Sequence, residues 1–245
     1  MKTDDSLRLE LFDCGKEFRT PPLLVALAGI LAVLFPICIW MVFFYAPIEK
    51  QMGFVQKIFY FHVPAAWIVL VSAPVMAVSS IAYLVKRSDR WDRLNDAAVE
   101  LAILFGALLL ISGPLWGRKA WGAYWVWDVR LTSSLVLVLT LVACKIVRSY
   151  AGHAAKQISA GLSVLAVLNA VFVYLSVELW RGTHPEKVVS KAGGLSPGMK
   201  STFWLCVFTF LVAYVVMLWV RTRVGKLETA LDRLHMKCVE AGLED

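Results

Sequence analysis

Six long runs of apolar residues dominate the chain, and short stretches that carry most of the charges separate them. The runs are Leu23–Tyr45, Pro64–Val85, Ala97–Leu115, Leu131–Val147, Ile158–Val177 and Ser201–Val220. A helix needs roughly 20 apolar residues to cross a hydrocarbon layer about 30 Å thick. The pattern therefore predicts six transmembrane helices that form a single membrane domain over residues 1–245.

The composition agrees with that pattern. Of 245 residues, 59% are hydrophobic and 18% are charged, and the mean hydropathy is +0.68. A soluble domain cannot bury so much apolar surface, so we expect an all-α integral membrane protein. Residues 1–22 are polar and carry both acids and bases, which is unlike a signal peptide. The first run is therefore expected to remain in the protein as a helix.

The net charge of +7 would suit a nucleic-acid partner, but its distribution favours a membrane topology. Sixteen of the 25 Lys and Arg residues lie in the two ends of the chain and in the connections after the second and fourth runs. The other three connections hold nine. By the positive-inside rule, both termini are expected in the cytoplasm and the other three connections on the outer side.

Residues 224–240, after the last run, show a helical period. Apolar side chains recur at spacings of three and four, at Val224, Leu227, Leu231, Leu234 and Cys238. This spacing predicts an amphipathic cytoplasmic helix. A lipid surface and a partner helix explain its apolar stripe equally well.

Several familiar motifs are missing from the sequence. The five cysteines form no C-x-x-C pair and no C-x-x-C-H motif, so we expect neither disulfide pairing nor covalently attached c-type haem. The sequence also lacks the P-loop pattern G-x-x-x-x-G-K-[ST], so any energy input is expected from a partner.

The outward segment 116–131 contains four of the ten tryptophans, at Trp116, Trp121, Trp125 and Trp127. An aromatic belt at the membrane interface is the ordinary explanation, but a belt spreads over many helix ends. The concentration in one connection favours a binding platform for a flat, apolar ligand such as haem. Other platform candidates are Gly117, Gly122, Tyr124, Asp128 and Arg130. If the segment is helical, Trp121 and Trp125 share one face.

Two of the four histidines fall on the same side as this segment. His62 precedes Pro64, which suits the first position of a helix and would fix the imidazole near the membrane surface. His184 follows the fifth run, whereas His153 and His235 fall on the cytoplasmic side. Two histidines beside an aromatic platform suit axial ligation of haem iron. Zinc would require three or four protein ligands.

Three motifs together resemble a known family. They are WGRKAWGAYWVWDVRLTS at 116–133, FHVP at 61–64, and SVE-LW-R-x-x-HP at 176–185. The first is similar to the tryptophan-rich WWD signature of haem-handling proteins in cytochrome c biogenesis. With six helices and this length, the chain resembles the cytochrome c maturation protein C family (CcmC) over about residues 45–220.

The resemblance implies a function. Haem b would be held without a covalent bond at the periplasmic side of a bacterial inner membrane, with His62 and His184 as axial ligands. It implies delivery to the haem chaperone CcmE, with CcmD and the transporter subunits CcmA and CcmB as partners. Transfer of haem is not enzymatic turnover. Arg118 and Lys119 would attract haem propionates or a partner, and a b-type cytochrome and a haem permease remain alternatives.

Overall fold

The computed structural model describes residues 19–180, 189 and 194–240. Its helices are α2 (Pro22–Trp40), α3 (Phe59–Lys86), α4 (Asp89–Trp121), α5 (Val129–Tyr150), α6 (Ala155–Leu179) and α7 (Pro197–Glu240). A π-helical turn η1 (Met41–Tyr45) continues α2, and 3-10 turns η2 (Phe54–Ile58) and η3 (Gly152–Ala154) lead into α3 and α6. Within these described residues, six helices are long and apolar enough to cross a membrane, which confirms the predicted spans and the all-α class.

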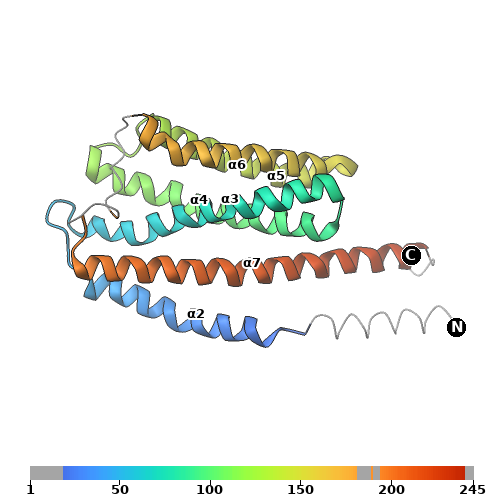
Figure 1. Cartoon of the computed structure of the whole chain (residues 1–245), viewed down its shortest axis with the longest axis horizontal. Coiled ribbons are helices and arrows are strands. Elements are labelled where there is room, and N and C mark those ends of the chain that lie inside the picture. Colours follow the sequence, from blue (N-terminus) through green and yellow to red (C-terminus); the bar gives the residue numbers. More distant parts are fainter. Residues whose placement is uncertain (1–18, 181–188, 190–193, 241–245) are drawn as a thin grey trace.

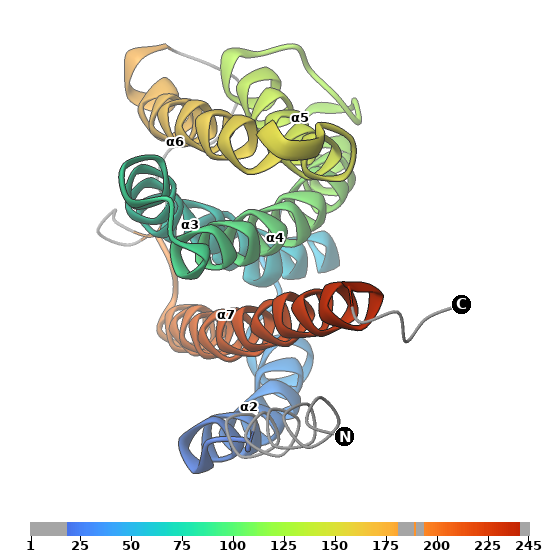
Figure 2. The same cartoon turned by 90° about the vertical axis from the view of Figure 1, so that its right-hand side faces the viewer.

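The helices form a stack of layers (Figures 1 and 2). Helix α7 lies between α2 and the pair α3–α4, and the pair α5–α6 covers the other side of α3–α4. Helices α3, α4, α5 and α6 contact one another around a closed circuit, because α3 also touches α6 and α4 touches α5. The last helix in the sequence therefore packs in the middle of the stack.

The two ends of the stack differ in what they carry (Figure 1). At one end lie the α2–α3 connection, the α4–α5 connection at residues 122–128 and the start of α7. We call this the aromatic end. At the opposite end lie the α3–α4 and α5–α6 connections, the start of α2 and the end of α7. The predicted outward connections thus share one end, as far as the described residues show them.

Small side chains allow close packing at the centre of the stack. Ala98 and Ala102 of α4 and Ala166 of α6 are fully buried in the main apolar cluster. At Gly106 of α4, an added Cβ would lie only 2.7 Å from a methyl carbon of Val138 in α5. Small residues at helix interfaces let backbones approach closely in a membrane, where packing rather than hydrophobicity drives association.

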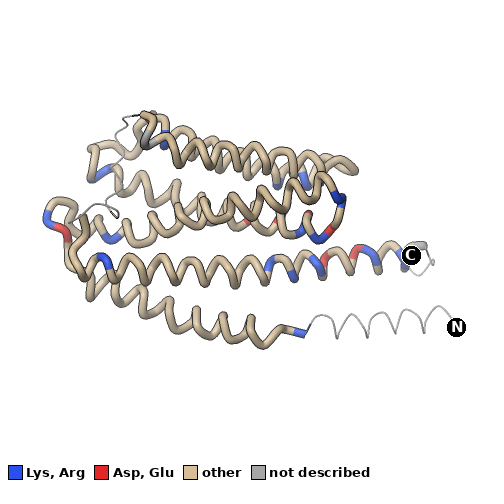
Figure 3. The backbone as a smooth tube through the Cα atoms, viewed as in Figure 1, with Lys and Arg blue, Asp and Glu red and all other residues tan. Residues whose placement is uncertain are grey.

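Ion pairs join the helices in the half opposite the aromatic end (Figure 3). Arg148 of α5 donates two hydrogen bonds, at 2.6 and 3.0 Å, to the carboxylate of the buried Asp92 of α4. Lys145 lies 2.7 Å from Asp96, and Arg221 of α7 lies 2.7 Å from Glu100. The acids all lie on α4, so this helix is fastened to both α5 and α7.

Several helices run further than the apolar pattern predicted, α4 and α7 most of all. Helix α4 continues past Leu115 to Trp121, since interfacial tryptophans and bases are compatible with a helix. Helix α7 continues without a break through the predicted amphipathic segment 224–240. That segment is helical, as expected, but it extends the sixth span and does not form a separate element.

Candidate functional site

His62 lies inside α3 and not ahead of it. The helix begins at Phe59, so the expectation that Pro64 occupies the first helical position is wrong. The reason is that η2 leads directly into α3 and starts the helix earlier than the proline. Pro64 is fully buried and offers no N–H to the Tyr60 carbonyl one turn back. The imidazole is nevertheless fixed near the aromatic end, in the first turn of a helix.

The His62 ring packs against α4. Its Nδ1 lies 2.8 Å from the Ser112 hydroxyl, and a Cβ added at Gly113 would lie 3.2 Å from its Cε1. Ser112 and Trp116 are four residues apart on the same helix, so they share a face. His62 is thereby held about one helical turn from the first tryptophan of the aromatic segment.

The tryptophan segment divides into two parts. Helix α4 ends at Trp121, and Gly122 follows with φ 76°, a left-handed conformation that terminates helices and favours glycine. Trp125 therefore lies in the irregular connection, so the condition under which Trp121 and Trp125 would share a helix face is not met. The cause is the glycine, whose conformation stops α4 before it can reach the third tryptophan.

In the helical part, Trp116 and Trp121 meet edge to face, with ring centroids 5.6 Å apart and an interplanar angle of 85°. Gly117 lies beneath the second ring, because a Cβ there would come within 3.0 Å of two Trp121 ring carbons. This is a physical reason for the Gly between the two tryptophans. The pair forms one aromatic wall at the end of α4.

In the irregular part, Trp125 and Trp127 form a second edge-to-face pair, with centroids 5.7 Å apart. The Trp125 indole nitrogen is buried and has no hydrogen-bond acceptor within the described residues. Asp128 then caps α5, since its carboxylate accepts a 2.7 Å hydrogen bond from the Leu131 N–H. An acidic cap at a helix start is favoured by the helix dipole.

The basic residues of the segment have different surroundings. Arg118 donates to the Gly122 carbonyl and lies 5.7 Å from the centre of the Tyr124 ring, so it closes the end of α4. Arg130 is half-buried in the first turn of α5, and its carbonyl accepts hydrogen bonds from Ser133 and Ser134. Among the described residues, its guanidinium forms no ion pair within 4.0 Å. It is the base that is better placed to receive an acidic group.

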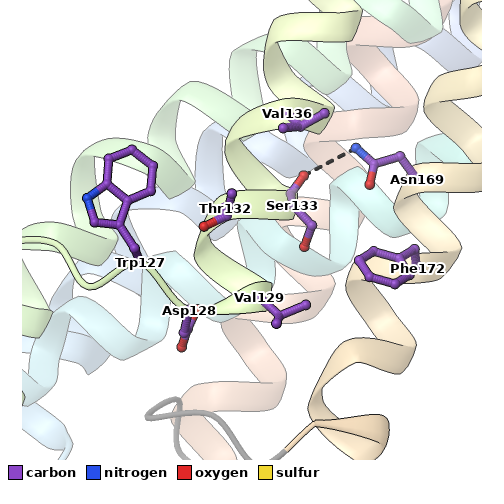
Figure 4. A pocket seen from close by; sticks show the side chains of 8 residues that line it. All are labelled: Trp127, Asp128, Val129, Thr132, Ser133, Val136, Asn169 and Phe172. Atoms are coloured by element: carbon purple, nitrogen blue, oxygen red, sulfur yellow. Dashed lines mark hydrogen bonds between the residues drawn. The ribbon is translucent and has the colours of Figure 1, made fainter.

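A pocket of about 450 Å³ opens beside the segment (Figure 4). It is lined by Trp127, Asp128, Val129, Thr132, Ser133, Val136, Asn169 and Phe172. Asn169 of α6 donates a 3.2 Å hydrogen bond to the Ser133 carbonyl of α5. The polar start of the fourth run thus lies against protein. The pocket takes in two platform residues, Trp127 and Asp128, and does not reach His62.

His184 lies outside the described residues, so the structure describes one of the two histidines proposed as ligands. His153, in η3, lies at the end opposite the aromatic end. Across the described part of the chain, no three His, Cys, Asp or Glu side chains gather as a metal site.

Two cysteines form a contact that the sequence did not predict. The sulfur atoms of Cys38 in α2 and Cys206 in α7 are 3.0 Å apart, and both side chains are fully buried. The partners are 168 residues apart and belong to no short motif. Both are free thiols, and no local sequence signal could have predicted their contact.

These features define a class of protein: a six-span membrane protein with a clustered aromatic segment and an imidazole at one end. The family model described as CcmC, heme exporter protein C, matches residues 17–237, and the chain belongs to this family.

Curated relatives support the assignment. The chain is 33% identical over 189 residues to heme exporter protein C of Escherichia coli strain K12, covering 74% of each chain. It is 33% identical over 175 residues to the Bradyrhizobium diazoefficiens protein of that name, covering 70% of this chain and 65% of the relative. A putative ccmC-like mitochondrial protein for cytochrome c biosynthesis from Marchantia polymorpha is 29% identical over 187 residues, covering 76% of this chain and 78% of the relative.

Proposed function

We propose that the chain binds haem b without a covalent bond at the periplasmic face of a bacterial inner membrane and transfers it to the haem chaperone CcmE. The observation that carries this proposal is the placement of His62 about one turn from Trp116, at the end where the aromatic residues gather. Imidazole is a standard axial ligand of haem iron, and aromatic faces hold flat apolar rings. Membership of the haem exporter protein C family is consistent with haem delivery for cytochrome c biogenesis.

The sidedness rests on charge. Lys and Arg are in excess at the end where the described chain begins and α7 finishes, which favours that end as cytoplasmic. The aromatic end would then face the periplasm. This is the side on which a haem chaperone for cytochrome c assembly would collect its cargo.

Within the site, each group has a proposed role. His62 and His184 would ligate the iron from opposite faces. Trp116, Gly117, Trp121, Gly122, Tyr124, Trp125, Trp127, Asp128 and Arg130 would form the platform. The Arg130 guanidinium, a planar fork suited to carboxylates, would bind a propionate. Haem here is cargo, so ligation must be strong enough to capture it and weak enough to release it.

The family also suggests partners for the chain. We propose that CcmD and the transporter subunits CcmA and CcmB assemble with this chain and that energy enters through them, because the sequence holds no P-loop. The chain itself would transfer haem without enzymatic turnover, and we assign it no catalytic residue.

The test is the absorption spectrum of the purified, full-length protein. His62→Ala and His184→Ala are each expected to convert six-coordinate low-spin haem into a weakened or altered species. His153→Ala and His235→Ala serve as matched controls, because both positions are predicted on the cytoplasmic side. An unchanged spectrum in both His62→Ala and His184→Ala would refute the ligand assignment.

A further inference from the structure

The Ser112 side chain lies within hydrogen-bond distance of two groups, the Leu108 carbonyl and the His62 ring. Its hydroxyl donates to the Leu108 carbonyl at 2.6 Å, one turn back on α4. A serine hydroxyl carries one proton, and this bond uses it. With that proton directed at the Leu108 carbonyl, the same oxygen accepts a hydrogen bond from His62 Nδ1, at 2.8 Å, and the imidazole carries a proton on Nδ1.

This arrangement selects one form of the imidazole. In a neutral ring with a proton on Nδ1, the lone pair that a metal requires is on Nε2. Ser112 is also largely buried, with 8% of its surface exposed, so water competes poorly for the bond. Gly113 of the same helix leaves room for the ring, because a Cβ there would crowd Cε1 at 3.2 Å.

We infer that Ser112 is a positioning residue, which fixes the tautomer and rotation of His62 so that Nε2 is presented to haem iron. The inference rests on the proposed function, in which His62 is an iron ligand. Partners of this kind fix ligand orientation and raise ligand basicity in metal sites. A neutral hydroxyl raises the basicity of the imidazole less than a carboxylate does, which suits a protein that must release its haem.

The first test uses the protein without haem. Nitrogen-15 NMR of the His62 ring, in full-length protein whose other three histidines are replaced, reports the tautomer directly. We expect the Nδ1–H form in the parent and a shift toward the Nε2–H form in Ser112→Ala. Ser112→Thr keeps a hydroxyl and is expected to restore the Nδ1–H form.

The second test uses the haem-loaded protein with all four histidines present. Ser112→Ala is expected to weaken haem affinity by about tenfold, the lower end of the range for such partners. The midpoint potential should also rise, because the ligand donates less electron density to the iron. Ser79→Ala is the matched control. Ser79 is a fully buried serine of α3 that bonds the carbonyl one turn back, at 2.6 Å, as Ser112 does.

The outcomes separate the two proposals. If Ser112→Ala matches Ser79→Ala in tautomer, affinity and potential, the positioning role is wrong, whatever His62 does. If Ser112→Thr behaves like Ser112→Ala in a folded protein, packing and not the hydroxyl matters, and the inference also fails. If His62→Ala keeps the parent haem spectrum while the apo tautomer responds to Ser112→Ala, the proposed ligand role fails and the hydrogen bond stands.

Discussion

Replacing Trp121 by Leu distinguishes a haem platform from a membrane-anchoring belt. In the structure, Trp121 packs edge to face on Trp116, with centroids 5.6 Å apart, and covers Gly117. Aromatic contacts of this kind contribute about 0.5–1.5 kcal/mol beyond area burial. If the exposed part of the ring stacks on porphyrin, Trp121→Leu removes a term of that size from haem binding. At a factor of ten per 1.4 kcal/mol, haem retention should weaken about two- to tenfold.

The assay is the rate at which haem leaves the protein for an excess of an apo-globin scavenger. It is best done in a His184→Ala background, because two iron–histidine bonds could mask a loss of this size. Trp219→Leu is the control, since Trp219 lies in the half of α7 away from the aromatic end. Equal haem retention in the Trp121→Leu and Trp219→Leu proteins would show that the tryptophans only anchor the protein, and the platform would be refuted.

Three further changes test the fold around the site. Gly106→Ala should cost about 1–3 kcal/mol of stability in thermal unfolding, because its Cβ would lie 2.7 Å from a methyl carbon of α5, whereas Gly161→Ala has open space and should cost little. Replacing Cys38 and Cys206 together by Ser should leave haem occupancy unchanged, since the pair joins α2 to α7 and not α3 to α4; loss of haem from a folded variant would contradict this. The backbone N–H groups of residues 52 and 51 donate hydrogen bonds to the Glu49 carboxylate and lower its pKa. These hydrogen bonds should therefore persist at neutral pH and be lost as pH falls through that lowered pKa. Amide NMR can follow the loss, and the Glu49→Gln protein should be insensitive to pH.

The spans could be predicted from the sequence because each is a continuous apolar run. The boundaries of the spans are harder to predict, because a signal such as proline reports only on its immediate neighbours in the sequence. Pro64 suggested a helix start, but the turn η2 before it already commits the chain to helix at Phe59. His62 therefore lies within α3 and not ahead of it. The sequence identifies 116–131 as an aromatic segment, but Gly122 divides it into a helical wall and an irregular connection.

The contacts of His62 and Cys38 could not be predicted in this way. Ser112 is 50 residues from His62, and Cys206 is 168 residues from Cys38. Each contact depends on how two helices rotate and slide against each other, which hydropathy does not specify. A serine within an apolar run also has an ordinary explanation, because its hydroxyl commonly bonds the carbonyl one turn back on its own helix. Ser112 does this and contacts His62 as well.

Helix α4 connects the two halves of the molecule. Its first half carries the acids that bind α5 and α7. One of them is Asp92, which pairs with Arg148 and whose side chain is only 4% exposed. Its second half carries Ser112, Gly113, Trp116, Gly117 and Trp121. Breaking a buried ion pair by removing one partner is strongly destabilising, so the first half is held firmly. The second half contacts His62 of α3 through the Ser112 hydroxyl and through the close approach of the ring to Gly113. Because the ion pairs and the His62 contacts lie on one continuous helix, α4 fixes His62 and the first two tryptophans relative to α5 and α7.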